Sequence, residues 1–365
     1  MASLFQACKS AVRNNQGGTF NIGGYDIDIE YYTQQDINDD IQYGDISFGD
    51  TDESKIVLVA SETITVPSGY TLTPDKPKKS LVIFCNNLVN NGTISMYQKA
   101  PNVLPHDFYI IQGSVINSNR NVIVPAYANN QVTKNFSSNK NGADGANGTN
   151  RNCGSGGTCS LNSTYNVSST AGSGYAFGGG AGSGAYKVGN SGTVNSVDST
   201  YPMRGSDANG SYQWFGGGVG NPVGKNFTWT SGTDIPQNFG CGGRVIIFCA
   251  NFTNNGTITV NGTSTHRTSS EGDPYYGGGC GHGGASGAGA VDLFYHVLSE
   301  QGTITANGGD TFNYYSTPGK GGNGSITLTQ WSLDKVIKEE RKIFTKDNWV
   351  YLFTNYSQRL REDVI

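Results

Sequence analysis

The chain has 365 residues, of which 14% are charged and 53 are glycine, and its formal net charge is -4. Globular domains usually contain about a quarter of charged residues, so the charged fraction of this chain is low, and an ordered but loop-heavy protein is expected. The weak acidic charge leaves no electrostatic footprint for nucleic acid. Aromatic residues make up 11% of the chain, which argues against disorder.

Residues 1–53 are predicted to form a distinct acidic region. Residues 25–31 alternate apolar and acidic side chains, which indicates a half-exposed strand. The acidic residues are interpreted as a solvated surface. A docking arm for a basic partner and a Ca²⁺ site are alternatives, although no EF-hand spacing is present. The region from Asp26 to Glu53 has no lysine or arginine and ten carboxylates: Asp26, Asp28, Glu30, Asp36, Asp39, Asp40, Asp45, Asp50, Asp52 and Glu53.

Residues 54–96 are predicted to form a β scaffold that contains the first copy of a repeat. Residues 55–60, 62–66 and 70–73 have the composition of short strands separated by turn residues. The repeat begins at residue 81 with LVIFCNNLVNNGTISM. It returns at residue 245 as VIIFCANFTNNGTITV and at residue 291 as VDLFYHVLSEQGTITA. Such self-similarity predicts stacked copies of one strand–turn–strand unit.

The Asn-Asn-Gly run of the repeat predicts a tight turn, because Asn and Gly tolerate positive φ. If the repeated units stack, the repeated Asn side chains are expected to stack between them. Cys85 and Cys249 occupy equivalent positions beside Phe, which indicates buried apolar side chains.

Glycine runs dominate an insertion at residues 97–242 and the spacers of residues 243–332, which hold the second and third repeats. The runs have two interpretations. Gly-rich chains are often flexible linkers. Alternatively, they form ordered, polyglycine-II-like strands that pack side by side, which glycine permits because it has no Cβ. The bulky residues beside each run favour ordered packing.

Aromatic residues beside the glycine runs are the candidate contact residues. Adaptable recognition surfaces combine rigid Tyr and Trp rings with Ser, Gly and Asn, and rings can also stack on sugars. The competing interpretation is that most of these rings pack against glycine backbones as core. The receptor-binding candidates are Tyr175, Phe177, Tyr186, Tyr212, Trp214, Phe215, Trp229, Tyr275, Tyr276, Tyr314 and Tyr315.

The sequence offers no recognisable catalytic or metal-binding constellation. There is no nucleophile elbow, phosphate loop or HExxH motif, and the chain has almost no helical pattern outside residues 333–344. Cys280 and His282 lack the ligand spacing of a structural zinc site, so neither a metal nor a cofactor is predicted. The enzymatic alternative is a β-helical polysaccharide depolymerase with paired acids, for which Glu271 and Asp273 are the nearest candidates.

Residues 333–365 regain charge and are predicted to form a C-terminal cap or assembly segment. Cys153 and Cys159 could close a small disulfide loop. No secretory leader is predicted, because the N-terminus has no apolar core region. No membrane insertion is predicted either, because no run of about 18 apolar residues occurs.

Strands that end in Asn-Gly-Thr-Ile and lead into glycine runs resemble bacteriophage tail-fibre and receptor-binding proteins. The matching segments are residues 91–94, 255–262 and 302–309, within a resemblance that covers roughly residues 80–330. The resemblance implies a virion appendage, often a homotrimer, whose glycine-rich adhesin region binds a host surface protein or glycan. Residues 1–53 would then dock onto other virion proteins. The long insertion and the charged C-terminal segment depart from simple glycine-rich adhesins, and no catalytic residue is implied.

The expected fold is mainly β, with a β-solenoid-like or sandwich scaffold of repeated strand–turn–strand units and ordered glycine-rich loops. The expected role is non-catalytic attachment to a host receptor from the exterior of a phage particle. A structural virion component, such as a baseplate, collar or head-decoration protein, is the first alternative. The depolymerase is the second.

Overall fold

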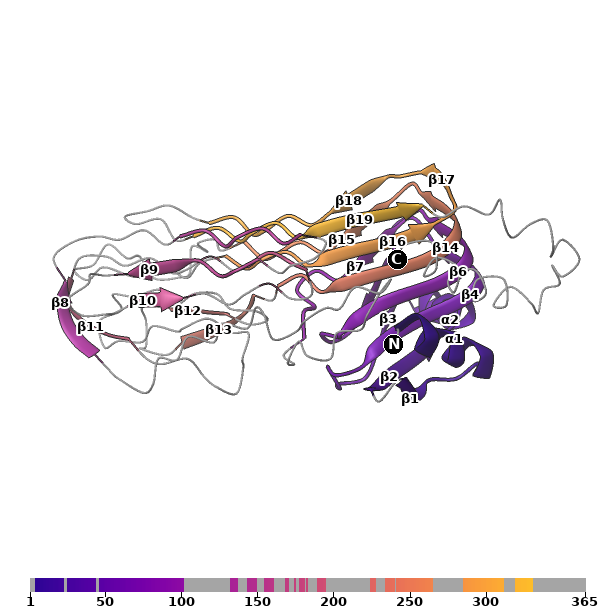
Figure 1. Cartoon of the computed structure of the whole chain (residues 1–365), viewed down its shortest axis with the longest axis horizontal. Helices are drawn as coiled ribbons and strands as arrows, with labels where there is room; N and C mark the ends of the chain where they lie inside the picture. The colour runs from indigo at the N-terminus through magenta and orange to yellow at the C-terminus, as the bar shows by residue number, and fades with distance from the viewer. Residues whose placement is uncertain are drawn as a thin grey trace, which may run out of the picture.

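The computed structural model is mainly β, with two helices and strands β1 to β19 among the residues that it describes (Figure 1). The described residues are 4–22, 25–43, 46–101, 132–136, 143–149, 154–160, 168–170, 174, 177–180, 182, 189–194, 224–227, 234–239, 241–264, 285–311 and 319–330.

Eight strands form the main sheet. Its order is β1 (Gly18–Ile22), β2 (Tyr25–Tyr32), β4 (Ile56–Val66), β6 (Ser80–Asn90), β14 (Arg244–Asn254), β16 (Ala290–Tyr295) and β19 (Ser325–Gln330), and β17 (Val297–Glu300) also pairs with β14. Only the β1–β2 pair is antiparallel. Residues 55–66, expected as two short strands, form the single strand β4.

Five short strands form a second sheet, in the order β3 (Ser47–Phe48), β5 (Thr71–Pro74), β7 (Thr93–Ser95), β15 (Thr257–Thr259) and β18 (Thr303–Thr305). All its neighbours are parallel. Each pass of the chain contributes a long strand to the main sheet and then a short one to the second sheet. The chain therefore returns to the same position one strand further along, as a stack of repeats requires.

The gapless alignment of the three sequence repeats matches most of the strand register, but a bulge in the third repeat places Glu300, not Ser299, opposite Thr253. Phe84 lies opposite Phe248, which lies opposite Phe294. The Phe248 and Phe294 rings stack with centroids 5.1 Å apart. Cys85 and Cys249 are likewise in register, and both are fully buried free thiols, as their position beside Phe predicts.

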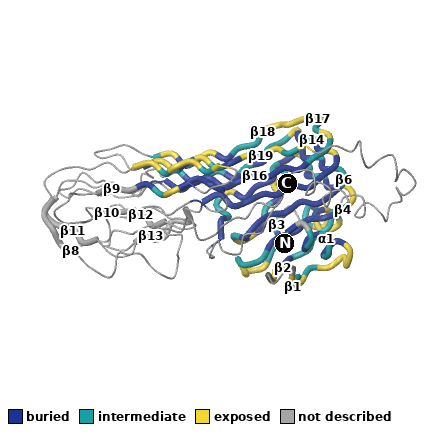
Figure 2. Tube along the Cα trace, in the orientation of Figure 1, coloured by how far each residue is buried: buried dark blue, intermediate teal, exposed yellow. Residues whose placement is uncertain are grey.

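The main apolar core lies between the two sheets, where alternate residues of both point inward. Ile83 and Ile247 come from the main sheet, and Ile94 and Ile258 come from the second sheet. Buried residues continue along this core and into the glycine-rich segments beyond it (Figure 2).

A ladder of Asn side chains joins the first two repeats, as the repeat pattern predicts. Asn90 Nδ2 donates to Asn254 Oδ1 at 2.7 Å, and Asn254 Nδ2 donates to the carbonyl of Gln301 at 2.6 Å. Both side chains are fully buried. Asn255 Nδ2 donates in the same way to Asn91 Oδ1 at 2.9 Å, but this second pair is exposed.

We expect Asn254→Ala to lower the free energy of unfolding by about 2 kcal/mol, because it removes a buried acceptor and leaves the Asn90 amide only its longer bond, at 3.2 Å, to the Thr257 carbonyl. Asn255→Ala breaks the equivalent hydrogen bond on the exposed surface, so it should change the free energy of unfolding by less than about 0.5 kcal/mol. Urea unfolding of the two variants beside the wild type measures the difference. Equal losses would show that burial does not set the strength of this ladder.

The Asn-Gly turn of the repeat differs from the expected one. Neither Asn90, Asn91 nor Gly92 has a positive φ. The chain instead bends from one sheet into the other at residues 91 and 92. Glycine is required at position 92 because the backbone of the preceding unit passes close to it. A Cβ at Gly92 would overlap the carbonyl oxygens of Pro67 and Tyr70.

Helix α1 (Leu4–Asn14) covers part of the outer face of the main sheet. Leu4, Ala7, Cys8 and Ala11 follow the spacing of one helical face, and all are fully buried. They share an apolar cluster with residues of β2, β4 and β6. The sequence analysis expected almost no helical pattern outside residues 333–344, and α1 departs from that expectation, although its helical spacing is present in the sequence.

Helix α2 (Gln34–Tyr43) packs at the N-terminal end of the core. Its Ile37 is fully buried in the cluster between the sheets. Thr33 and Asp36 begin the helix as a reciprocal cap, in which the Thr33 backbone N–H donates to Asp36 at 2.6 Å. The acidic region of residues 1–53 thus belongs to the two-sheet scaffold, and residues 25–31 lie in the strand that their alternation predicts.

Six further strands pair as antiparallel two-stranded sheets within the insertion. These are β8 (Val132–Phe136) with β11 (Gly189–Val194), β9 (Thr158–Ser160) with β10 (Ser168–Thr170), and β12 (Gly224–Phe227) with β13 (Asp234–Phe239). In Figure 1 they lie at the end of the molecule remote from the main sheet.

Candidate functional site

Glycine-rich segments from distant parts of the chain lie side by side and extend away from the two sheets (Figure 1). They are joined by backbone hydrogen bonds. The N–H of Gly180 donates to the carbonyl of Ala146 at 2.9 Å, and Gly322 donates to Gly180 at 2.8 Å. Gly179 donates to Ala288 at 2.9 Å, and Ala288 donates to Gly322 at 3.1 Å. We call the described residues 143–149, 154–157, 174, 177–180, 182, 241–243, 260–264, 285–289, 306–311 and 319–324 the glycine bundle.

The backbones of the bundle approach too closely for any side chain between them. A Cβ added at Gly287 would lie 2.5 Å from the carbonyl carbon of Gly179 and closer still to its oxygen. One added at Gly154 would lie 2.7 Å from the carbonyl carbon of Ala146 and would overlap its oxygen. Glycine is needed at these positions because it alone has no Cβ.

Polar side chains satisfy outer backbone groups of the bundle. The N–H of Lys320 donates to Asp144 Oδ1 at 2.7 Å, and the N–H of Asn323 donates to Asn147 Oδ1 at 2.9 Å. Asn323 Oδ1 in turn accepts the N–H of Gly308 at 2.9 Å. Exposed N–H groups are thereby paired within the chain, which keeps the outer edges of the bundle from pairing with other chains.

Phe177 is the one predicted contact residue whose surroundings the structure describes. It is 6% exposed, and the Arg244 guanidinium lies 5.1 Å from its ring centre. Its ring therefore packs in the interior. The other ten candidates lie outside the described residues: Tyr175, Tyr186, Tyr212, Trp214, Phe215, Trp229, Tyr275, Tyr276, Tyr314 and Tyr315.

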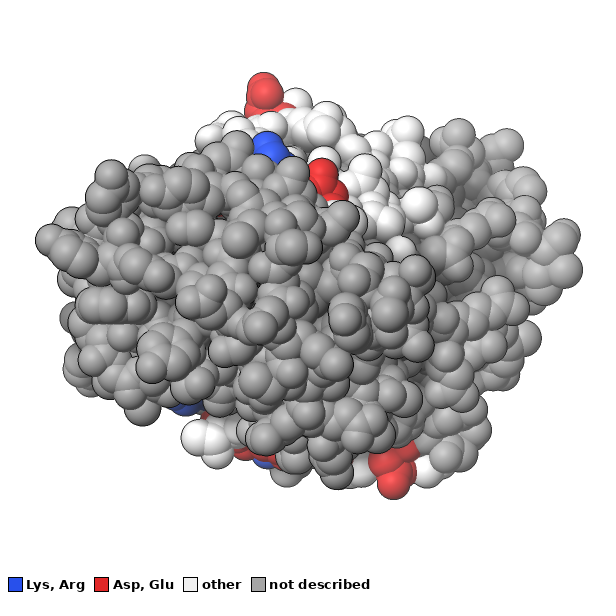
Figure 3. All heavy atoms as spheres, turned by 90° about the vertical axis from the view of Figure 1, so that its left-hand side faces the viewer, with Lys and Arg blue, Asp and Glu red and all other residues white. Residues whose placement is uncertain are grey.

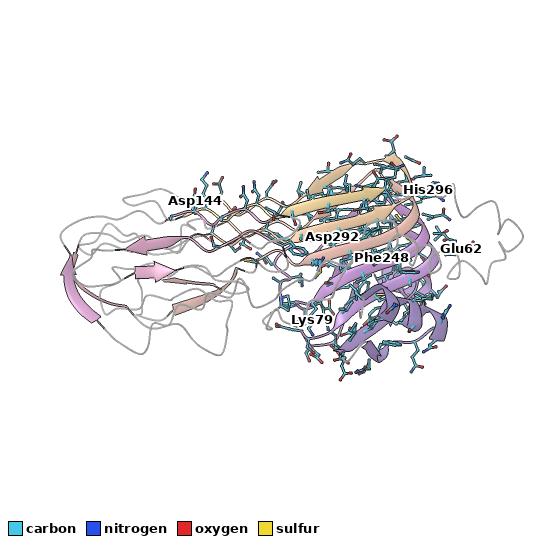
Figure 4. All side chains as sticks on the ribbon, in the orientation of Figure 1. Glu62, Lys79, Asp144, Phe248, Asp292 and His296 are labelled. Atoms are coloured by element: carbon cyan, nitrogen blue, oxygen red, sulfur yellow. The ribbon has the colours of Figure 1, made fainter. Side chains whose placement is uncertain are left out.

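The described acids of residues 131–330 do not form a pair of catalytic type. Asp292 is buried and accepts two hydrogen bonds from Arg244, at 2.6 and 2.9 Å. Asp310 forms an ion pair with Lys320, which lowers the pKa of Asp310. His296 lies at the far end of the long strands from Asp144 (Figure 4). Glu271 and Asp273, like Cys280 and His282, lie outside the described residues.

Part of the acidic N-terminal region surrounds a buried lysine. Lys78 is fully buried, and its Nζ contacts the Glu30 carboxylate, Asp50 Oδ1 at 2.8 Å and the carbonyl of Asp52 at 2.9 Å. Lys55, on the surface, contacts the other oxygen of Asp50. This acidic cluster is thus partly an internal ion-pair network.

The two carboxyls at Lys78 respond differently to their surroundings. Burial, followed by hydrogen bonding with Asp50, raises the pKa of Glu30 although Lys78 contacts it. Hydrogen bonding with Glu30 and then with the two lysines holds the pKa of Asp50 far below its usual range. The two pKa values therefore shift in opposite directions, upward at Glu30, whose side chain is 11% exposed, and downward at Asp50, whose side chain is 47% exposed.

A row of hydroxyl groups on the outer face of the second sheet has no counterpart in the sequence-based expectations. Thr71, Thr93, Thr257 and Thr303 form this row in register, and the apolar residue after each points inward. Aligning the Thr-Ile pairs of the three repeats could have revealed most of it. The row forms an uncharged polar surface outside the glycine bundle.

The described cysteines are poor nucleophiles. Burial raises the pKa of the thiols of Cys8, Cys85, Cys241 and Cys249. Cys153 lies outside the described residues, and the side chain of Cys159 does as well. Within the part of the chain that the structure describes, no group of three His, Cys, Asp or Glu side chains could hold a metal ion.

Figure 3 views the molecule from the side of the glycine bundle, and the charged side chains that it draws lie at the margin of this view. Neither helix of the described residues is long and apolar enough to cross a membrane. Searches for similar proteins give no match to a family model, a curated protein or a solved structure.

Proposed function

We propose that the protein is a bacteriophage virion appendage that attaches the particle to a glycan or protein on the host cell surface, without catalysis. The observation that carries the proposal is the glycine bundle. Its segments bond to one another through their backbones and extend away from the two sheets, and in the sequence these segments are interspersed with the aromatic candidates. Such a support would hold recognition loops away from the particle.

The proposal includes a finer description of the architecture. The two parallel sheets, built by successive passes of one chain, would be a short β-solenoid. The bundle would be a polyglycine-II-like assembly, in which each extended strand bonds to several neighbours. Carbonyl acceptors from three different segments around Gly179, Gly180 and Gly322 support this description.

A rigid support favours binding because it reduces the ordering that a loop undergoes on contact with its receptor. Tyr and Trp contribute large contact area with few rotatable bonds, and their rings can stack on sugars. The ten aromatic candidates outside the described residues would supply these contacts. Phe177 is buried and would contribute indirectly.

The acidic N-terminal region would dock onto other virion proteins. Glu30 and Asp50 are engaged by Lys78 and Lys55, so this role would fall to more exposed carboxylates, such as Asp26 and Asp39. A homotrimeric assembly and a capping role for residues 333–365 are parts of the same proposal.

The test is binding of fluorescently labelled protein to whole host cells. A variant with Trp214, Phe215, Tyr275 and Tyr276 changed to Ala is expected to bind at least about tenfold more weakly, because aromatic anchors dominate binding energy. Circular dichroism and thermal unfolding must first show that the variant is folded.

A variant with the exposed Thr71 and Thr303 changed to Ala is the control, since it alters a polar surface outside the aromatic loops. It is expected to bind like the wild type. If the wild type, in its native oligomer, does not bind cells, the attachment role is wrong and a structural role in the particle replaces it. Release of reducing sugar from host capsule would indicate the depolymerase instead.

A further inference from the structure

Phe177 has a backbone conformation that side chains rarely adopt. Its φ is 72°, in the left-handed region that normally requires glycine, and glycine follows it at Gly178, Gly179 and Gly180. A residue with a Cβ persists in this region only when its surroundings hold it there. The residues around Phe177 must therefore hold it in this conformation.

The surroundings are the first residues of the main-sheet strands. The Arg244 guanidinium, at the start of β14, lies 5.1 Å from the Phe177 ring centre, and Ser325 Oγ, at the start of β19, donates to the Phe177 carbonyl at 3.0 Å. Arg244 and Ser325 occupy the same register row, on either side of Ala290. Phe177 thus contacts two strands that flank a third.

Arg244 is itself fixed. Its Nε and Nη2 both donate to Asp292 Oδ2, and Arg244 is 2% exposed. Figure 4 shows Asp292 near the start of β16, on the side of the glycine bundle. A guanidinium held in this way presents its plane to the ring in one position, which a flexible cation would not do.

The residues after Phe177 continue this attachment through the backbone. Gly178 accepts the N–H of Gly154 at 2.8 Å, and Gly179 donates to Ala288 at 2.9 Å. Because residues 178 to 180 are all glycine, a shift of one residue in one direction would still leave glycine at both positions 179 and 180, where the backbone meets neighbouring carbonyls. The close backbone contacts therefore do not fix the alignment of this segment, whereas a single ring with a specific partner does.

We propose that Phe177 is the positioning residue that fixes the glycine-rich segment of residues 177–180 in one register on the two-sheet scaffold, through Arg244, Asp292 and Ser325. This inference rests on the proposed function in one respect: the glycine bundle that Phe177 aligns is the proposed support of the receptor-binding residues. Phe177 itself does not touch the receptor.

The experiment measures amide hydrogen exchange by mass spectrometry, together with cell binding, for three variants of the full chain. Phe177→Gly keeps the left-handed conformation accessible but removes the ring. Exchange in residues 143–149 and 174–182 is expected to rise about tenfold, while that of β4, β6 and β14 stays unchanged. Phe177→Tyr keeps the ring face and is expected to restore slow exchange. Binding to cells should weaken about tenfold in the first variant and recover in the second.

Gln98→Gly is the matched control, because Gln98 is also a non-glycine residue with positive φ, at 58°, on the scaffold. It should leave both measurements unchanged. Unchanged exchange in Phe177→Gly, or faster exchange throughout the scaffold, would overturn the positioning role. If Phe177→Gly does not fold, Arg244→Lys, which keeps the charge and loses the planar fork, takes its place with the same criteria. If wild-type protein binds no cells, the proposed function fails while the exchange data still decide the role of Phe177.

Discussion

Gly287→Ala is expected to destabilise the glycine bundle by about 3 kcal/mol or more, at the upper end of the cost of overpacking. The added Cβ would overlap the carbonyl of Gly179, and it would lie 2.9 Å from the oxygen of Gly180. These obstacles are backbone atoms, which cannot rotate away as a side chain could. Relief requires that two segments separate, which would break the hydrogen bond from Gly179 to Ala288.

Thermal unfolding and limited proteolysis measure this effect, and Asn307→Ala is the control. Asn307 is exposed in the same bundle, and the hydrogen bond that it donates to Asn261 comes from its backbone. The control is expected to unfold like the wild type. If Gly287→Ala also unfolds like the wild type and resists protease equally well, the close backbone packing of the bundle is wrong.

Lys78→Met is expected to lower the free energy of unfolding by about 3–5 kcal/mol, the usual cost of leaving a buried charge without its partner. The substitution removes the cation that faces Glu30 and Asp50 and leaves the Glu30 carboxylate partly buried, with 11% of its side chain exposed. Met fills a similar volume, so the loss reports the charge and not a cavity. Chemical denaturation at neutral pH measures it.

Lys55→Met tests the other lysine of the same network. The side chain of Lys55 is 30% exposed, and that of its partner Asp50 is 47% exposed. The free energy of unfolding is therefore expected to fall by less than about 1 kcal/mol. The double variant Lys78→Met, Glu30→Gln should recover part of the stability, because the unpaired carboxylate is gone. A loss from Lys78→Met no greater than that from Lys55→Met would contradict the buried network.

The repeat pattern by itself determined most of the strand register among its three copies, but not the bulge that places Glu300 opposite Thr253. A gapless match between residues 81–96, 245–260 and 291–306 can become contact only if equivalent residues face one another, as Phe84, Phe248 and Phe294 do. The same logic predicted the ladder of Asn90 and Asn254. Repeats reveal these pairs because equivalent residues of stacked repeats become neighbours in the structure.

Tertiary structure alone decided the contacts between parts of the chain that share no pattern. Lys78 and Glu30 meet across two strands, and neither residue type signals a buried position. Phe177 was expected at a contact surface, since an aromatic ring beside glycine suits either a loop tip or a core. Composition shows that glycine backbones can approach closely, but which segments meet depends on where the rest of the chain holds them. Long-range packing determines which glycine segments pack against one another, and the local sequence of a segment does not encode it.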